Sequence, residues 1–226
     1  MIKAGIDQDA IVKMFSEATA KQGEALRKAV SEATLKALQG RELTMANIKK
    51  VLSTVTTAAS AGAAQNIAGP VDVEAMLTKA FAGMDAALLQ AVEANRKALQ
   101  QFVDQGAALQ EKPLKSALAN IEKMEDTFFA TVTQAAKGVP GPMQAPWEHV
   151  LSAMKMKGTD TGAQATQTVE QLVAQAQTAL RDGRAATAKT AQAMIDGYAA
   201  LVSGVLIGMS EGLQSGGTAA PASKKK

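Results

Sequence analysis

The side chains best suited to acid–base or metal chemistry in this chain are one histidine and one acidic cluster. His149 is the only histidine among the 226 residues. A Glu-x-x-His metal element would need a carboxylate at position 146, where Pro146 stands. Glu122, Glu125 and Asp126 form the acidic cluster, but no second cluster offers it a partner for paired-carboxylate catalysis. We therefore expect a surface or packed histidine beside a linker, and an acidic face in contact with solvent.

Other signatures of chemistry are missing from the sequence. The chain has no cysteine, which excludes disulfides, iron–sulfur clusters and thiolate zinc sites. No GxxxxGK[ST] phosphate loop is present, and no serine lies in a strand–turn–helix context. We expect no catalytic residue, no cofactor, no metal and no small-molecule substrate. A small-molecule enzyme would instead need a buried pocket that joins His149 to several carboxylates.

A stripe of small residues is the most distinctive pattern in the chain. Ala200, Gly204, Gly208 and Gly212 recur every four residues and would share one edge of a helix. Such an edge lets another backbone or a lipid-like surface approach closely. Glycine costs roughly 1 kcal/mol against alanine inside a helix, so a close contact is expected to offset that cost. The stripe favours assembly or surface contact.

The same helix carries a broad apolar arc beside the stripe. No charged residue lies between Asp196 and Glu211, a segment shorter than the ~20 residues of a membrane-spanning helix. Three interpretations stay open: a core helix with a close neighbour, a self-association seam, or insertion into a lipid or polymer surface. Ile207 points away from the arc, which comprises Tyr198, Leu201, Val202, Val205, Leu206, Met209 and Leu213.

Composition and apolar spacing predict an all-α protein. Aromatic residues are 3% of the chain, while helix-forming residues dominate it. We expect an elongated bundle of four to six amphipathic helices, with Phe81, Phe102, Phe128 and Phe129 as apolar anchors. One helix should begin after Thr44 and end before Gly69. The others should cover residues 7–39, 73–109, 114–137, 147–157 and 163–213.

Prolines and glycines divide the chain. We expect an N-terminal helical region over residues 1–137, a Pro/Gly linker over 138–146, a C-terminal helical region over 147–213 that packs on the first, and a disordered tail over 214–226. Trp147 should anchor the linker in the bundle, with a hydrogen-bond partner for its indole N–H.

The net charge of the chain is concentrated at its C-terminal end. The formal net charge is +3, and Lys224, Lys225 and Lys226 supply all of it. The body is neutral, so we expect no specific nucleic-acid binding, which needs a basic face. The lysine tail solubilises the chain or makes a modest, salt-sensitive contact with an anionic surface. No apolar signal region opens the sequence, which predicts a cytoplasmic protein, with an inclusion or membrane surface as a further location.

Two long runs are rich in Ala, Gln, Leu, Lys and Glu: MLTKAFAGMDAALLQAVEANRKALQQFVDQGAALQ at 76–110 and TVEQLVAQAQTALRDGRAATAKTAQAM at 168–194. These runs resemble the phasins, which are bacterial, non-enzymatic helical proteins that coat polyhydroxyalkanoate granules. Two other segments, RELTMANIKKVLSTVTTAASAGAAQN at 41–66 and LVSGVLIGMSEGL at 201–213, are more similar to an uncharacterised helical family of proteobacteria. The resemblance transfers no functional residue.

These observations favour a non-catalytic protein that coats a hydrophobic surface, such as a polyhydroxyalkanoate granule. The alternative is a soluble homo-oligomeric scaffold that binds other proteins. Homo-oligomerisation is expected in either case, because alanine-rich helices bury little apolar surface per chain. The predicted contact residues are Leu201, Val205, Leu206 and Met209, with Gly204, Gly208 and Gly212 allowing close approach.

Overall fold

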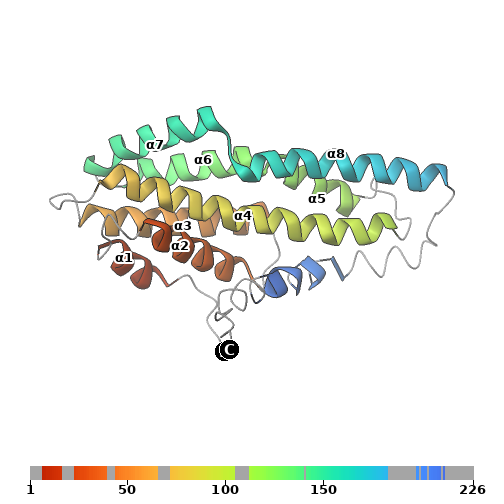
Figure 1. Ribbon diagram of the computed structural model, residues 1–226, viewed down its shortest axis with the longest axis horizontal. Coiled ribbons are helices and arrows are strands. Elements are labelled where there is room, and N and C mark those ends of the chain that lie inside the picture. Colours follow the sequence, from red (N-terminus) through yellow and green to blue (C-terminus); the bar gives the residue numbers. More distant parts are fainter. Residues whose placement is uncertain are drawn as a thin grey trace, which may run out of the picture.

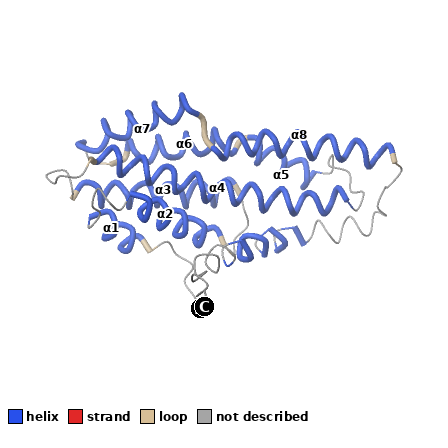
Figure 2. The backbone as a smooth tube through the Cα atoms, viewed as in Figure 1, coloured by secondary structure: helices blue, strands red, loops and turns tan. Residues whose placement is uncertain are grey.

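The computed structural model is all-α throughout the residues it describes, which are 7–16, 23–39, 44–65, 72–104, 112–139, 141–182, 197–198, 200–202, 204–209 and 211. Its helices run along the long axis of an elongated bundle (Figures 1 and 2). The predicted fold class is confirmed. The helices are α1 (Gln8–Ser16), α2 (Gly23–Leu38), α3 (Met45–Ala64), α4 (Val73–Asp104), α5 (Lys112–Glu122), α6 (Met124–Lys137), the 3₁₀ turn η2 (Gly141–Met143), α7 (Gln144–Lys157) and α8 (Asp160–Arg181).

Residues 197–198, 200–202, 204–209 and 211 are also helical, and they are drawn in blue in Figure 1. We call these residues the C-terminal segment. Residues 199, 203 and 210 within it are outside the described part of the chain, as are Gly212 and the lysine tail. None of the described helices is both long and apolar enough to cross a membrane.

Helix α4 is the centre of the bundle. It packs mainly against α2 and α8, while α3 packs against α1 and α6. The apolar positions of α4 recur at helical spacing and are buried, which explains why this long helix forms and where it lies. Phe81, Phe102 and Phe128 are almost fully buried and Phe129 partly so. These predicted anchors therefore pack inside the bundle and do not line its surface.

The helices of the structure differ from several predicted ranges. Within 7–39 the structure describes α1 and α2, which pack mainly on α3 and α4 respectively, and residues 17–22 between them lie outside the described part of the chain. The range 114–137 is interrupted at Lys123, whose ψ of 5° leaves the α-helical region. No glycine or proline marks that interruption. The bundle consequently has more and shorter helices than the four to six predicted.

The predicted linker 138–146 is shorter in the structure. Residues 141–143 form η2, and α7 begins at Gln144 instead of Trp147. Pro146 fits in the first turn of α7, where backbone N–H groups have no partner within the helix. Helices α7 and α8 pack against α4, α5 and α6.

Trp147 anchors α7 as predicted. Its side chain is fully buried, and its indole Nε1–H donates a hydrogen bond of 2.8 Å to the Ser60 hydroxyl of α3. Ser60 in turn donates to the Thr56 carbonyl at 2.6 Å, so the polar atoms of this buried contact are satisfied.

Two glycines allow helices to approach each other at backbone distance. A Cβ built on Gly62 of α3 would lie 2.6 Å from the Val12 carbonyl oxygen of α1. One built on Gly83 of α4 would lie 2.6 Å from the Arg27 carbonyl oxygen and 2.8 Å from the Val30 Cβ of α2. These separations are below van der Waals contact, so only glycine fits at either position.

Candidate functional site

The C-terminal segment contains most of the contact residues that the sequence predicts. Val202 and Leu206 are 1% and 0% exposed, and they join the core of the bundle. Leu201, Val205 and Met209 are partly buried against it. The apolar arc of the segment therefore faces the bundle, and the segment is docked on it.

Hydrogen bonds from two helical regions join this segment to the bundle. The Tyr198 hydroxyl donates a hydrogen bond to the Asn95 amide oxygen of α4, and its ring lies 5.9 Å from that of Phe102. The Gln39 side-chain amide donates to the Leu206 carbonyl oxygen at 3.5 Å, the long end of the hydrogen-bond range. Burial raises the pKa of the Tyr198 hydroxyl, so this group stays a proton donor.

The glycine stripe does not face the bundle. Ala200, Gly204 and Gly208 are all exposed. No atom lies within 4 Å of a Cβ built on Gly204 or Gly208. The interpretation of a core helix with a close neighbour along its glycine edge is therefore wrong within the chain. Close approach occurs at Gly62 and Gly83 instead, while contact of the stripe with a partner stays a prediction.

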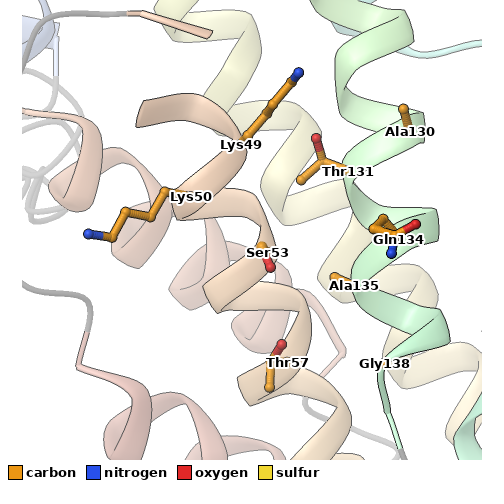
Figure 3. A pocket seen from close by; sticks show the side chains of 9 residues that line it. All are labelled: Lys49, Lys50, Ser53, Thr57, Ala130, Thr131, Gln134, Ala135 and Gly138. Carbon is orange, nitrogen blue, oxygen red and sulfur yellow. The ribbon is translucent and has the colours of Figure 1, made fainter. Parts of the chain in front are cut away.

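A second surface feature is an open groove of about 640 Å³ between α3 and α6. Figure 3 shows Ser53 and Thr57 on α3 facing Gln134 on α6, with Lys49 at one end and Lys50 pointing away from α6. Ala130, Thr131 and Ala135 of α6 also line the groove. The groove offers hydroxyl, amide and amine groups to solvent, but none of its lysines is buried.

Two carboxylates from other helices bind the start of α8. Asp85 of α4 is only 8% exposed, and its two oxygens accept hydrogen bonds from the backbone N–H groups of Asp160 (3.0 Å) and Thr161 (3.1 Å). The Thr161 hydroxyl donates to the Asp85 carbonyl oxygen at 2.9 Å. Because the first N–H groups of a helix have no partner within it, Asp85 supplies a cap from outside.

Glu125 of α6 is the second carboxylate. It accepts hydrogen bonds from the Thr159 N–H at 3.0 Å and the Thr159 hydroxyl at 2.6 Å. Gly162 leaves room for this carboxylate, which would lie 2.2 Å from an added Cβ. The predicted solvated acidic face is therefore wrong at Glu125, although Glu122 and Asp126 are exposed.

With these caps, α8 begins earlier in the sequence than predicted. The sequence predicts a helix from Ala163, but α8 begins at Asp160. Gly158 has a φ of 77°, a conformation that favours glycine, and it turns the chain out of α7. Thr159 then accepts a hydrogen bond from the Gly162 N–H at 2.9 Å, as an N-cap residue does.

Burial raises the pKa of Asp85 above its ordinary value of 3.8, although the hydrogen bonds from Thr161 and Asp160 oppose the shift. The native state therefore binds this proton more tightly than the unfolded state does. The protonated Asp85 carboxyl group therefore adds to the free energy of unfolding at low pH. This contribution is lost as pH rises above 3.8 and through the higher pKa of the native state. We expect the stability of the wild type relative to Asp85→Asn to be greatest at low pH and to decline as pH rises.

Urea unfolding of both proteins across a pH series checks this expectation, since the amide of the asparagine variant does not titrate. A difference in unfolding free energy that stays constant with pH, or increases as pH rises, would contradict the raised pKa of Asp85.

His149 lies on the surface, beside the predicted linker. Its Nδ1 is 2.8 Å from a carboxylate oxygen of Glu74, and both side chains are exposed. Among the described residues, no three His, Asp or Glu side chains are grouped so as to hold a metal ion.

The helices and surfaces above define an all-helical bundle protein with a docked C-terminal segment whose glycine edge is open. The chain belongs to DUF6781, a family of unknown function whose model matches residues 1–215. The match includes residues 41–66 and 201–213, and the coarser expectation of a family of unknown function is confirmed. No curated protein and no solved structure matches the chain.

Proposed function

We propose that this protein is a non-catalytic coat protein that binds a hydrophobic surface, such as a polyhydroxyalkanoate granule, through the apolar arc of its C-terminal segment. The single observation that carries the proposal is the way this segment is docked. Its apolar residues Val202 and Leu206 are buried against the bundle, and the hydrogen bonds that join it to the bundle include the one from Tyr198 to Asn95 and the long one from Gln39 to Leu206.

Undocking exchanges one apolar environment for another. Each fully buried Val, Leu or Met side chain contributes about 1.5–3 kcal/mol, whether it is covered by the bundle or by an apolar particle. A surface that covers Leu201, Val205 and Met209 more completely than the bundle does would favour the undocked segment. These three side chains are only partly buried in the docked state.

The resemblance to phasins supports the same class of surface. The two runs that resemble them include much of α4 and α8, two helices that pack against each other. In the docked state, the large apolar side chains that the described residues expose are Met156, Val173 and Ile207. A coat protein of this kind therefore needs a segment that can leave the bundle. The C-terminal segment carries an apolar arc that can bind a hydrophobic surface.

The test is co-sedimentation with polyhydroxybutyrate particles and, separately, with anionic liposomes, each at low and high salt. We expect salt-resistant binding to the particles that Leu206→Asp abolishes. Ile207→Asp is the matched control, because it adds the same charge at the next residue but outside the apolar arc. It should leave binding unchanged.

Tyr198→Phe should strengthen binding to the particles. Removing the hydrogen bond to Asn95 costs the docked state about 1 kcal/mol, which should raise particle affinity about fivefold. Binding to neither surface, or equal loss in the two aspartate variants, would contradict the proposal. Failure to bind together with one sharp oligomer would favour the soluble scaffold.

A further inference from the structure

The groove between α3 and α6 is a cavity that the proposed surface contact does not use. Its volume of about 640 Å³ lies within the range of small-molecule pockets, roughly 300–1,000 Å³. On α3, Lys49, Ser53 and Thr57 recur every four residues and therefore share one face of the helix. Gln134 of α6 lies opposite them (Figure 3). A ligand lying along α3 would meet an amine and then two hydroxyl groups over about 12 Å.

The polar groups that face each other across the groove have no partner within the described part of the chain. Thr54 of α3 and Thr131 of α6 each donate to the carbonyl oxygen four residues earlier, at 2.8 Å and 2.6 Å, as hydroxyl groups in helices often do. Ser53 and Thr57 make no such bond, and the Gln134 amide has no protein partner either. These three groups are available to donate hydrogen bonds to a ligand.

The charge of the groove is positive. Lys49 and Lys50 supply it, and the described residues that line the groove include no aspartate or glutamate. Neither lysine has an ion-pair partner among the described residues. The two side chains differ in direction, because Lys49 stands at one end of the groove whereas Lys50 points away from α6 (Figure 3). One negative charge is therefore expected in a ligand, at the end beside Lys49.

We propose that this groove binds a short oligoester of a hydroxy acid. Its carboxylate lies beside Lys49, and its ester oxygens accept hydrogen bonds from Ser53, Thr57 and the amide of Gln134. The short aliphatic units between the esters match small side chains such as Ala135. A single carboxylate suits the one lysine that faces the groove better than a phosphate group, which carries nearly two charges. The choice of a hydroxy acid rests on the proposed function, since the chain ends of a polyhydroxyalkanoate have this chemistry.

An NMR titration of the isotope-labelled full chain with the linear trimer of β-hydroxybutyric acid tests the site. We expect saturable shifts in the amides of residues 49–57 and 130–138. Lys49→Ala should raise the Kd of the trimer about fivefold, the upper range for an exposed ion pair. Lys50→Ala is the matched control, because it removes the same charge from a side chain that points away from α6. It should leave the Kd unchanged.

A second variant tests the place of the ligand without changing any charge. Ala135→Leu puts a larger side chain into the groove and should abolish binding of the trimer. Ala153→Leu, at an exposed alanine of α7 outside the groove, should not. Circular dichroism verifies that each variant is folded. The methyl ester of the trimer should bind about fivefold more weakly than the acid, and inorganic phosphate should not displace the trimer.

No saturable shift in the two ranges, an equal loss of affinity in Lys50→Ala, undiminished binding to Ala135→Leu, undiminished binding of the methyl ester, or displacement by phosphate would each overturn the proposal. The result is separate from the test of the coat function, because the groove lies on α3 and α6 and not on the C-terminal segment. Particle binding without trimer binding would contradict only the groove site. Trimer binding without particle binding would contradict only the coat function.

Discussion

Gly83→Ala is expected to lower the free energy of unfolding by about 2–3 kcal/mol, although alanine is the better helix former. The added Cβ would lie 2.6 Å from the Arg27 carbonyl oxygen and 2.8 Å from the Val30 Cβ. Both atoms belong to the packed face of α2, so the helices must separate to accept the methyl group. That separation loosens the contact between α2 and α4 and the buried side chains around it.

The matched control is Gly208→Ala. It makes the same substitution in a helix, but nothing lies within 4 Å of the new Cβ. It should leave stability unchanged or raise it by up to about 1 kcal/mol. Urea unfolding of both variants measures the difference. A stabilising Gly83→Ala would mean that α2 and α4 do not approach at backbone distance.

Asp85→Ala is expected to destabilise the protein by about 2–4 kcal/mol. The substitution leaves the N–H groups of Asp160 and Thr161 without their acceptor at a largely buried helix end. Removing the buried charge recovers part of its desolvation cost, which keeps the loss below the sum of two unsatisfied groups. Hydrogen exchange should increase first in the opening turn of α8.

Asp85→Asn provides the control for this prediction. Its amide keeps one acceptor oxygen and nearly the same volume, so it should lose less stability than Asp85→Ala when both are measured at neutral pH. An alanine variant as stable as the asparagine variant would show that water replaces the Asp85 carboxylate at no cost, and that Asp85 does not hold α8 in place.

Apolar spacing predicted the long central helix because burial follows that spacing directly. The residues of α4 from Met76 to Val103 that recur on one face are the ones that the bundle buries. The anchoring of Trp147 was predictable for a similar reason, since a large ring with one polar atom needs both burial and a partner. Its particular partner, Ser60, depends on how α3 and α7 pack.

The glycines show where sequence spacing is insufficient. The stripe at positions 204 and 208 is conspicuous in the sequence, yet within the chain it is open to solvent. Gly62 and Gly83 stand alone in alanine-rich helices, and it is they that meet another backbone. Which glycine is covered depends on the pairing of helices distant in sequence, and this pairing is not encoded in the spacing of one helix.

The sequence did not predict that Asp85 and Glu125 cap α8, although the position of Asp85 indicates a buried carboxylate. Asp85 lies four residues after Phe81, on the apolar face of α4, and a charged residue in such a position requires a partner. Glu125 gave no comparable signal, because its neighbours Glu122 and Asp126 are exposed. The partner of both carboxylates, the start of α8, follows them at a distance in sequence that no local pattern reveals.

Hydrogen exchange of the free and particle-bound protein tests most directly whether the C-terminal segment leaves the bundle to bind a hydrophobic surface. On polyhydroxybutyrate particles, the amides of residues 204–209 should exchange more slowly, because an apolar surface covers them. Those of residues 35–39 should exchange faster, because Gln39 loses its contact with Leu206. Unchanged exchange in both stretches of the bound protein would contradict undocking and place the contact elsewhere on the molecule.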